Sequence, residues 1–299
     1  MKLAARFSIQ AMVLITGIFV STAMAQTLHY IQYPGATDTY VLAVTNQPSS
    51  NLSAVVGYYL DSAGAKHGFV LQGGKYATLD VRGGTDTILW GVKGGNTGTL
   101  LIVGSYTAPT GDQGFGYMDG VLRLTNPPGA VQSHAYGDSS PSFLLIAGDY
   151  LDAAGAWHGY VANGTTQDPV YTILDVPGAV GSHATNASKN GWVTLQWDDA
   201  NGHTESSLYQ SQTFTTIDVP NATDSYAHAV DSFGNVAFSW LDAQGKTHGA
   251  VLTHKTGVYT TVDPADCVNT SANGINDYHV LVGTCEKADG HSYGFWLVF

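Results

Sequence analysis

The sequence has little positive charge and few long apolar segments. Only 11 of its 299 residues are Lys or Arg, against 23 Asp or Glu, so the formal net charge is −12 at pH 7. Nucleic-acid binding takes most of its affinity from Lys and Arg on phosphates, and binding to an anionic membrane surface uses the same residues. We therefore expect no nucleic-acid partner. After residue 26 no apolar run approaches the length of a spanning helix, about 20 residues, so we expect no transmembrane segment in the mature chain.

Cysteine is also scarce, with Cys267 and Cys285 the only two. In an oxidising compartment an isolated pair usually forms a bridge. The sequence has no Cys-x-x-Cys, and the spacing of the two residues matches no zinc pattern. We predict one structural disulfide that closes a local loop.

The N-terminus has the pattern of a signal peptide. Lys2 and Arg6 form a short basic region, residues 11–20 are almost wholly apolar, and residues 21–25 are mostly small. An uncleaved membrane anchor is the alternative, but the apolar stretch is short for one. We predict cleavage after Ala25 and a secreted, extracellular or periplasmic mature chain. That chain keeps 9 Lys and Arg against 23 Asp and Glu, a charge of −14.

A ten-residue phrase occurs three times, about 90 residues apart: LDSAGAKHGF at 60–69, LDAAGAWHGY at 151–160 and LDAQGKTHGA at 241–250. A second phrase, FTTIDVP at 214–220, has related copies at about half that spacing. Its six copies begin at His29, Tyr76, Leu122, Tyr171, Phe214 and Tyr259. Each unit contains four short β-like runs divided by turn residues, without helical periodicity.

Four strands in about 45 residues is the size of a propeller blade, and a stacked solenoid is the alternative. The sixth unit ends at residues 293–299 without its last strand, and a lone copy of that strand stands at residues 28–34. A ring uses this copy to complete the sixth blade, whereas a solenoid leaves its edges unpaired. We therefore predict an all-β chain with one domain, 26–299. It is a six-bladed β-propeller of four-stranded blades, closed by the N-terminal strand on the C-terminal blade, and we expect a monomer.

Two aligned positions predict how the blades pack. One position holds only Ala or Gly: Ala43, Gly91, Ala135, Ala184, Ala229 and Gly274. We place it on the innermost strand, where large side chains of neighbouring blades would collide. The next strand ends in a large aromatic residue in five units, for example Tyr150 and Trp240, and in Cys285 in the sixth. We expect these aromatics to form the main core between blades.

The position before the Ala/Gly position carries the candidate site. It reads Leu42, Trp90, His134, His183, His228 and Asn273. If this position faces the axis, the channel mouth gathers the ligand-binding residues Trp90, His134, His183, His228 and Asn273. Three imidazoles with an open coordination position suit zinc or another first-row metal, so His134, His183 and His228 are the candidate ligands of a divalent metal. The alternative is that these histidines line a wet channel independently.

The His-Gly end of the repeated phrase has a structural and a functional interpretation. Asp152 and Gly155 suit a hairpin turn, and His158 then starts the next strand. Asp61 and His67 could instead form a metal or acid–base pair. A catalytic pair is needed once, whereas a folding device is needed in every blade, so we favour the structural interpretation.

The repeated phrases resemble those of the HAF-type extracellular repeat family, named for a His-Ala-Phe tripeptide. The chain has His-Gly-Phe at 67–69, His-Gly-Tyr at 158–160 and His-Gly-Ala at 248–250, with Ile-Asp-Val-Pro at 217–220 and Gly-Ile-Asn at 274–276. The resemblance covers residues 28–299, but the second and fourth units depart from it, with Phe-Gly-Tyr at 115–117 and Thr-Glu-Ser-Ser at 204–207. It implies an exported repeat protein, often surface-associated, for which the family supplies no catalytic residues.

Function is the least determined part of the sequence. It contains no nucleophile-elbow, zinc-protease, phosphate-loop or dinucleotide motif, and we assign no catalytic residue. We predict a secreted or cell-surface binding module with a glycan, peptide or cation at an axial mouth. A metal-assisted hydrolase or glycan lyase that uses the three histidines is one alternative, and a purely structural surface-layer component is another.

The signal peptide gives the first testable prediction. Export from a host with a general secretion pathway should yield a protein whose N-terminal residue is Gln26. Intact-mass spectrometry of the exported protein checks this, and a mass that includes residues 1–25 would contradict it.

Overall fold

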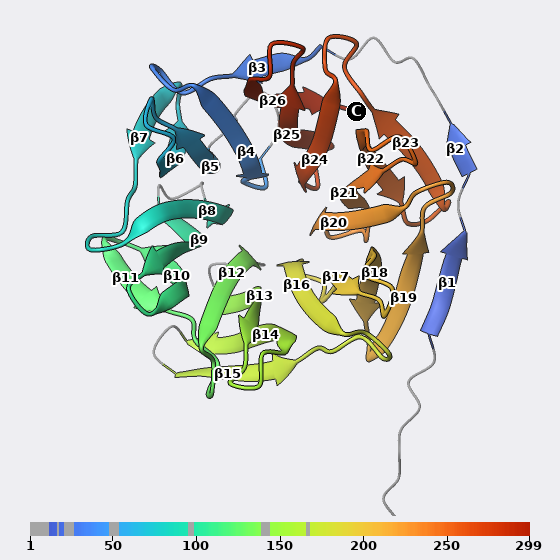
Figure 1. The fold of residues 1–299 in the computed structure, drawn as a ribbon, viewed down its shortest axis with the longest axis horizontal. Coiled ribbons are helices and arrows are strands. Elements are labelled where there is room, and N and C mark those ends of the chain that lie inside the picture. Colours follow the sequence, from blue (N-terminus) through green and yellow to red (C-terminus); the bar gives the residue numbers. More distant parts are fainter. Residues whose placement is uncertain are drawn as a thin grey trace, which may run out of the picture.

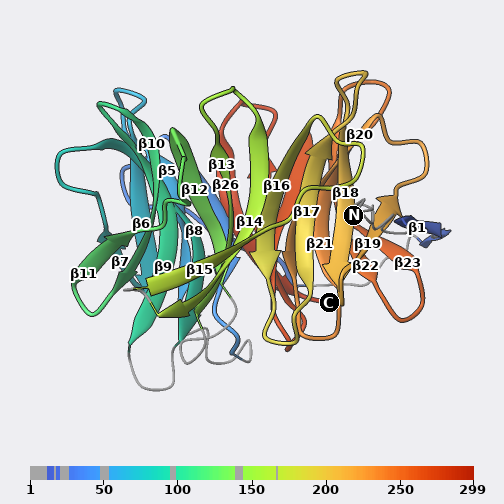
Figure 2. The same ribbon diagram turned by 90° about the horizontal axis from the view of Figure 1, so that it is seen from below.

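The computed structural model describes residues 12–16, 18–20, 27–47, 54–94, 99–138, 144–165 and 168–299. Six antiparallel sheets of four strands stand around one axis, as Figure 1 shows. Their strands run between the two ends of the ring (Figure 2). This confirms the predicted six-bladed propeller and excludes the solenoid.

Blades 1 to 3 follow one another along the chain, each from its inner to its outer strand. Blade 1 contains β4 (Asp38–Val44), β5 (Val55–Leu60), β6 (Lys66–Gln72) and β7 (Lys75–Thr78). Blade 2 contains β8 (Thr85–Gly94), β9 (Leu100–Ala108), β10 (Gly111–Met118) and β11 (Val121–Leu124). Blade 3 contains β12 (Gln132–Asp138), β13 (Leu144–Leu151), β14 (Trp157–Thr165) and β15 (Asp168–Ile173).

Blades 4 to 6 continue in the same order. Blade 4 contains β16 (Gly181–Ala187), β17 (Val193–Asp198), β18 (Thr204–Gln210) and β19 (Thr213–Asp218). Blade 5 contains β20 (Asp224–Val230), β21 (Val236–Leu241), β22 (Thr247–Thr253) and β23 (Val258–Val262). Blade 6 contains β24 (Asn269–Ile275), β25 (Val280–Glu286), β26 (Ser292–Val298) and, as its outer strand, β3 (His29–Ile31).

The outer strand of blade 6 comes from the other end of the chain. β3 pairs antiparallel with β26, with Ile31 opposite Gly294. The Tyr30 hydroxyl donates to the Asp266 carboxylate at 2.6 Å, and the Lys287 ammonium lies 4.1 Å from the centre of the Tyr30 ring. Beside this cluster Cys267 and Cys285 are joined by the predicted disulfide.

Two further strands lie in the predicted signal peptide. β1 (Met12–Thr16) runs parallel to β19, and β2 (Ile18–Val20) runs parallel to β23, along the outside of blades 4 and 5 (Figure 1). Cleavage after Ala25 stays a prediction. No helix in the described part of the chain could cross a membrane.

The core is built from a different set of residues than the sequence predicted. Tyr150 and Trp240 are only partly buried. Each stacks on the repeated histidine opposite it, with ring centres 5.1 Å apart for Tyr150–His158 and 4.3 Å apart for Trp240–His248. Four of the six large rings that are fully buried in the described residues stand instead two residues after the histidine position: Phe69, Phe115, Tyr160 and Phe295. The expectation that the strand-end aromatics form the main core was therefore wrong.

These buried rings are matched in volume by the residue opposite them. In four blades a glycine faces the ring, in the pairs Gly57–Phe69, Gly104–Phe115, Gly148–Tyr160 and Gly283–Phe295. Blades 4 and 5 reverse the sizes, with the pairs Leu195–Ser207 and Phe238–Ala250. A Cβ added to Gly148 would lie 2.5 Å from the Tyr160 ring. In each blade this cross-strand pair thus combines one large and one small side chain, and the large one stands on either the second or the third strand.

The repeated histidines have a structural role, as the sequence favoured. His158 Nδ1 lies 2.9 Å from the Asp175 carboxylate and Nε2 lies 3.5 Å from that of Asp152 in the hairpin turn. The hydrogen bond with Asp175 is the main cause that raises the pKa of His158. Blade 2 has an amide pair in the same place, because the Asn126 side chain donates to Gln113 Oε1 at 2.6 Å. Gln113, rather than Phe115, is therefore the position equivalent to the repeated histidine.

The matched volumes give a double-mutant test in blade 5. Ala250→Phe overfills the site and should cost about 1–3 kcal/mol of unfolding free energy, and Phe238→Gly leaves a cavity that should cost about 3–5 kcal/mol. The double variant restores the arrangement of the other blades, so its loss should be smaller than the sum of the two. Urea denaturation measures all three, and strict additivity would contradict the exchange.

Candidate functional site

Each inner strand carries a bulge halfway along its length. The register of every inner pair shifts by one residue there, for example between Val41 and Ala43 in blade 1 and between Ala135 and Gly137 in blade 3. Such a bulge leaves its residue out of the ladder and re-aims its side chain. All six bulged residues line one axial pocket, and we call them the bulge tier: Leu42, Trp90, Tyr136, Thr185, His228 and Asn273.

The bulges correct the predicted alignment. In blades 3 and 4 the bulged residues are Tyr136 and Thr185, so His134 and His183 stand two residues earlier than His228 does in its strand. We call this second level the mouth tier: Tyr40, Ile88, His134, His183, Tyr226 and Ser271. Side chains two residues apart on a strand share a face. His134 and His183 therefore still line the pocket, but one level away from His228.

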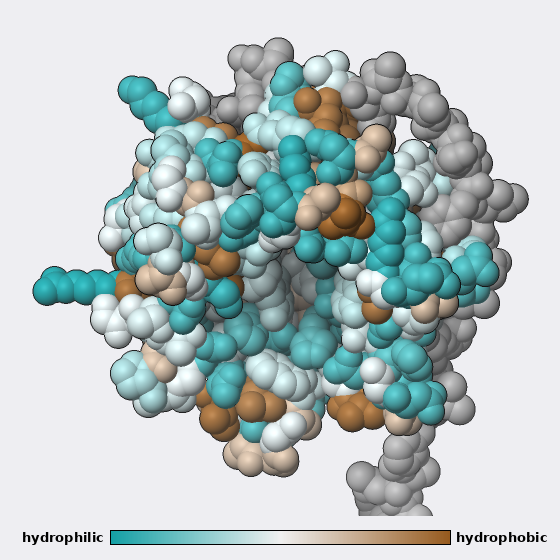
Figure 3. Space-filling view, turned by 45° about the horizontal axis from the view of Figure 1, so that its top comes forward, coloured by the Kyte–Doolittle hydropathy of each residue, from teal (hydrophilic) through white to brown (hydrophobic). Residues whose placement is uncertain are grey.

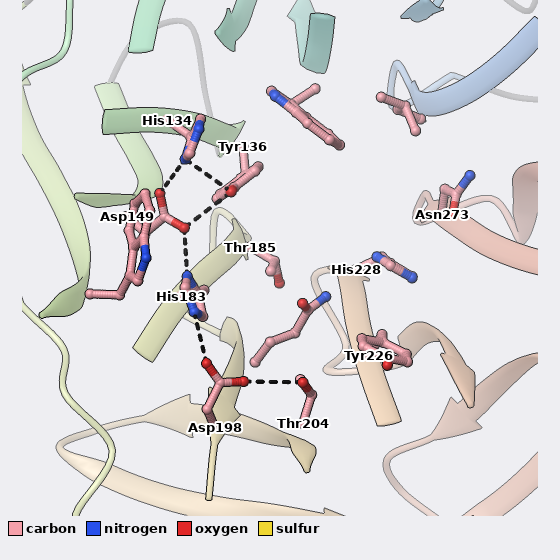
Figure 4. Close-up of a pocket in the computed structure, with 14 residues that line it drawn as sticks. His134, Tyr136, Asp149, His183, Thr185, Asp198, Thr204, Tyr226, His228 and Asn273 are labelled. Carbon is pink, nitrogen blue, oxygen red and sulfur yellow. Dashed lines mark hydrogen bonds and ion pairs between the residues drawn. The ribbon is translucent and has the colours of Figure 1, made fainter. Parts of the chain in front are cut away.

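The two mouth-tier histidines share one buried carboxylate. His134 Nδ1 lies 2.6 Å from Asp149 Oδ1, and His183 Nδ1 lies 2.6 Å from Asp149 Oδ2. The Tyr136 hydroxyl donates to the same Oδ2 at 3.0 Å (Figure 4). The Asp149 side chain is only 1% exposed. Because Asp149 belongs to blade 3 and His183 to blade 4, this carboxylate joins two blades.

The outer nitrogens of both imidazoles face further carboxylates. His134 Nε2 lies 3.5 Å from Asp112 Oδ2, and His183 Nε2 lies 3.6 Å from Asp198 Oδ2. Three carboxylates and two imidazoles thus alternate in one series, of which His134, Asp149, His183 and Asp198 line the pocket. We call this series the carboxylate–imidazole chain: Asp112, His134, Asp149, His183 and Asp198.

In the carboxylate–imidazole chain, His134, Asp149 and His183 favour their charged forms. Burial lowers the pKa of His134 and His183, but the hydrogen bonds and charge of Asp149, with smaller contributions from Asp112 and Asp198, outweigh it and raise both pKa values above 6.5. Burial acts to raise the pKa of Asp149, and the hydrogen bonds from the two imidazoles bring it below 3.8. The centre of the chain is therefore an anion held between two groups that favour the cation.

His228 is in a different state. Its Nε2 pairs with the Ser239 hydroxyl at 2.6 Å, and burial lowers its pKa to about 4, so it is neutral at pH 7. Within the described part of the chain, the one group with three candidate ligand atoms within 4.8 Å of one another is Asp266, Cys267 and Cys285, which includes the disulfide. The structure does not bring His134, His183 and His228 together as one ligand set.

The pocket has a volume of about 520 Å³, within the range of about 300–1,000 Å³ that small ligands occupy. All five residues predicted from the sequence lie on its wall: Trp90, His134, His183, His228 and Asn273. Trp157 stands between the two mouth-tier imidazoles, with its ring centre 5.5 Å from that of His134 and 5.6 Å from that of His183. Figure 3 shows a hollow at the centre of the ring with mostly hydrophilic side chains around it.

Sequence reasoning missed Asp149, although a signal was present. The strand after the inner strand has a polar residue directly before its strand-end aromatic, or before Cys285, in every unit: Tyr58, Ser105, Asp149, Gln196, Ser239 and Thr284. Each of these is the cross-strand partner of a mouth-tier residue. A polar position maintained between apolar neighbours indicates a wet channel, and Asp149 is its only charged member.

At the opposite end of the ring, described loops meet at Asp277. Its carboxylate accepts hydrogen bonds from the Lys189 ammonium, the Ser232 backbone N–H and the Asn46 side-chain amide, each at 2.8 Å. Burial acts to raise the pKa of Asp277, but these partners lower it to about 2. These hydrogen bonds fix loops of blades 4, 5, 6 and 1 to one another at this end. The mouth-tier residues lie toward the other end, which carries the hairpin turns of the repeated ten-residue phrase.

No family model matches the chain, and no curated protein does. Solved structures share its fold. AofleA from Arthrobotrys oligospora is 12% identical, with 92% of this chain and 88% of that one covered and a TM-score of 0.55. The SapL1 lectin in complex with α-methyl fucoside is 8% identical, with 89% and 94% covered and a TM-score of 0.55. The six-bladed fucose-recognising lectin of Aleuria aurantia is 11% identical, with 87% and 93% covered and a TM-score of 0.52. At these identities the likeness shows the fold, and the HAF-type resemblance stays a prediction.

Asp149→Asn should lower the pKa of His134 and of His183. Burial lowers both pKa values, and the variant removes the negative charge of Asp149 that raises them. Histidine ring NMR across a pH series measures both, with His158 at the rim as a control whose raised pKa should not change. If both pocket histidines titrate as in the wild type, Asp149 does not hold their charge.

The same variant predicts a pH-dependent stability difference. Because the pKa of Asp149 is lowered, its contribution to the free energy of unfolding is present above pH 3.8 and is lost as the pH falls further. Because the pKa values of His134 and His183 are raised, their contribution is present below pH 6.5 and is lost as the pH rises. The urea midpoints of wild type and Asp149→Asn should therefore differ most between pH 3.8 and 6.5. A difference that is constant with pH would contradict this.

Proposed function

We propose that the protein is a carbohydrate-binding propeller that holds a sugar in its axial pocket without catalysis. The carboxylate–imidazole chain beside Trp157 is the observation that carries the proposal. Sugars present neighbouring hydroxyls that both donate and accept hydrogen bonds, together with C–H faces that pack on aromatic rings. A pocket with few polar groups, fixed in place beside aromatic side chains, is the usual form of a small-ligand site.

The geometry gives each group a role. The imidazole Nε2 atoms of His134 and His183 donate to sugar oxygens, and the carboxylate of Asp198, which also lines the pocket, accepts from a hydroxyl beside them. Hydrogen bonds with a charged partner are about twice as strong as neutral ones. Asp149 binds both Nδ1 atoms, so the two donors are already oriented before a ligand arrives.

The similar structures support the ligand class. The SapL1 structure contains α-methyl fucoside, and the Aleuria aurantia lectin is described by its fucose recognition and six-bladed fold. The hydrolase or lyase alternative needs His134, His183 and His228 on one metal, and their geometry does not offer that ligand set. We therefore propose that the axial pocket binds its ligand through hydrogen bonds and stacking.

The proposal includes the location. We propose that the mature chain is one propeller domain, residues 26–299, that acts at or beyond the cell surface. The disulfide between Cys267 and Cys285 and the low content of charged residues, 11%, support an oxidising, extracellular environment.

A glycan array that includes fucosides tests the ligand class. The purified protein should bind at least one sugar class equally well with and without chelator. Trp157→Ala should weaken that binding by about tenfold or more, because the loss of one packed aromatic face costs at least 1.4 kcal/mol, about tenfold in Kd. Phe233→Ala is the control, since Phe233 is 63% exposed and does not line the pocket.

Three results would count against it. A folded wild-type protein that binds no glycan overturns the proposed ligand class. Binding that disappears with chelator overturns the metal-free mechanism. Chemical turnover of a bound glycan overturns the assignment as a binding module.

A further inference from the structure

A second hollow of about 310 Å³ lies beside the axial pocket. It is lined from blades 1, 5 and 6, and it shares Leu42 and Asn273 with the axial pocket. Because both shared residues belong to the bulge tier, the two hollows meet at the axis. We call them the first lobe, of about 520 Å³, and the second lobe.

The second lobe offers a different set of polar groups. Its walls include the hydroxyl side chains of Thr247, Ser271 and Thr284 and one carboxylate, Glu286. Glu286 is held in position by the Asn269 side chain, which donates to it at 2.9 Å. Hydroxyl groups both donate and accept, as the hydroxyls of a sugar do.

An aromatic face borders the same lobe. The Tyr40 ring, which lines it, is stacked on the Tyr58 ring with centres 4.5 Å apart and planes 8° apart. The pair is held flat by this stacking, so Tyr40 presents a fixed surface. The second lobe thus has the two kinds of group, hydroxyl or carboxylate and aromatic, that the first lobe also combines.

The wall between the lobes is fixed by hydrogen bonds. His228 Nε2 pairs with the Ser239 hydroxyl at 2.6 Å, Ser239 with Ser271 at 2.8 Å, and Ser271 donates to Asn273 Oδ1 at 2.7 Å. The Asn273 amide in turn donates to the Val41 carbonyl at 2.8 Å. The two lobes therefore keep a constant relative position, which lowers the cost of binding one ligand across both.

We propose that the second lobe binds the next sugar of a chain, so that the ligand is an oligosaccharide of at least two units that crosses Leu42 and Asn273. This rests on the proposed function, because it assumes that the first lobe binds a sugar. The volume of the second lobe equals the lower end of the range of about 300–1,000 Å³ for small-ligand pockets, which suits one further unit.

The charge of the two lobes selects among sugars. The first lobe is lined by two carboxylates, Asp149 and Asp198, and by two imidazoles that favour the cation, with Asp112 3.5 Å behind His134. Among the residues that the structure describes, no Lys, Arg or His lines the second lobe beside Glu286. A uronic or sialic acid would add a like charge to this surface, whereas an amino sugar would bring an opposite one. The oligosaccharide is therefore neutral or amino-bearing.

Calorimetry with three ladders of one to four units tests length and charge together: N-acetylglucosamine (neutral), glucosamine (amino) and galacturonic acid (acidic). In the neutral or amino ladder the affinity should rise about tenfold or more from one unit to two and then level off. The acidic ladder should bind more weakly at every length. No binding by any ladder overturns this inference, and the glycan array then decides separately whether the proposed function fails as well.

Thr247→Trp isolates the second lobe. Thr247 is opposite Leu241 as Trp157 is opposite Leu151, so blade 3 already carries Trp at this strand position. The variant should abolish the gain from the second unit and leave the affinity for the single sugar unchanged. Retained binding of the single sugar shows that the variant is folded.

Lys66→Trp is the matched control, because Lys66 occupies the same position in blade 1, opposite Leu60, and lines neither lobe. It should leave both affinities unchanged. Equal binding of one and two units by the wild type, or an undiminished gain in Thr247→Trp, overturns the second subsite while the proposed function stands. Glu286→Gln should reduce the preference for the amino ladder over the neutral one at the second unit, and an unchanged preference there overturns the assigned charge selection.

Discussion

The inner strands of six sheets converge on one axis, and the space left there determines what they can carry. A Cβ on Gly91 would lie 2.8 Å from the Tyr136 carbonyl oxygen in the next blade, and one on Gly274 would lie 3.0 Å from the Leu42 carbonyl oxygen. The residue after each bulge therefore abuts the neighbouring strand and is small in most blades. The bulge itself places its side chain in the central space, so the pocket wall is a consequence of how closely the strands approach.

Repetition made the fold predictable, and the same repetition hid part of the site. Two phrases with a period of about 45 residues gave the number of blades, the strands and the partner of the N-terminal strand. The alignment slipped by two residues in blades 3 and 4 because Ala occurs on both sides of the bulge. Ala43 follows the bulged residue, whereas Ala135 and Ala184 precede it. A bulge has no fixed residue type, so the sequence alone does not show its place.

The histidines show how position decides chemistry. His158 at the rim belongs to a device that recurs from blade to blade, and its partners Asp152 and Asp175 come from repeated phrases. His134 and His183 are paired with Asp149, the only carboxylate among the six residues at that strand position. Sequence could find the first arrangement because it recurs. The second is found where the repetition fails, since six equivalent blades would give six equivalent walls.

The reversed side-chain sizes in blades 4 and 5 bear on the ancestry of the blades. A lineage that changes from the Gly–Phe arrangement to the Phe–Ala arrangement by single substitutions passes through a form with two rings in one space or with none. Selection acts against either intermediate, so the arrangement is inherited rather than readily exchanged. Blades 4 and 5 are adjacent in the chain and share the rarer form, so a return to the common arrangement in either needs two substitutions in the same pair.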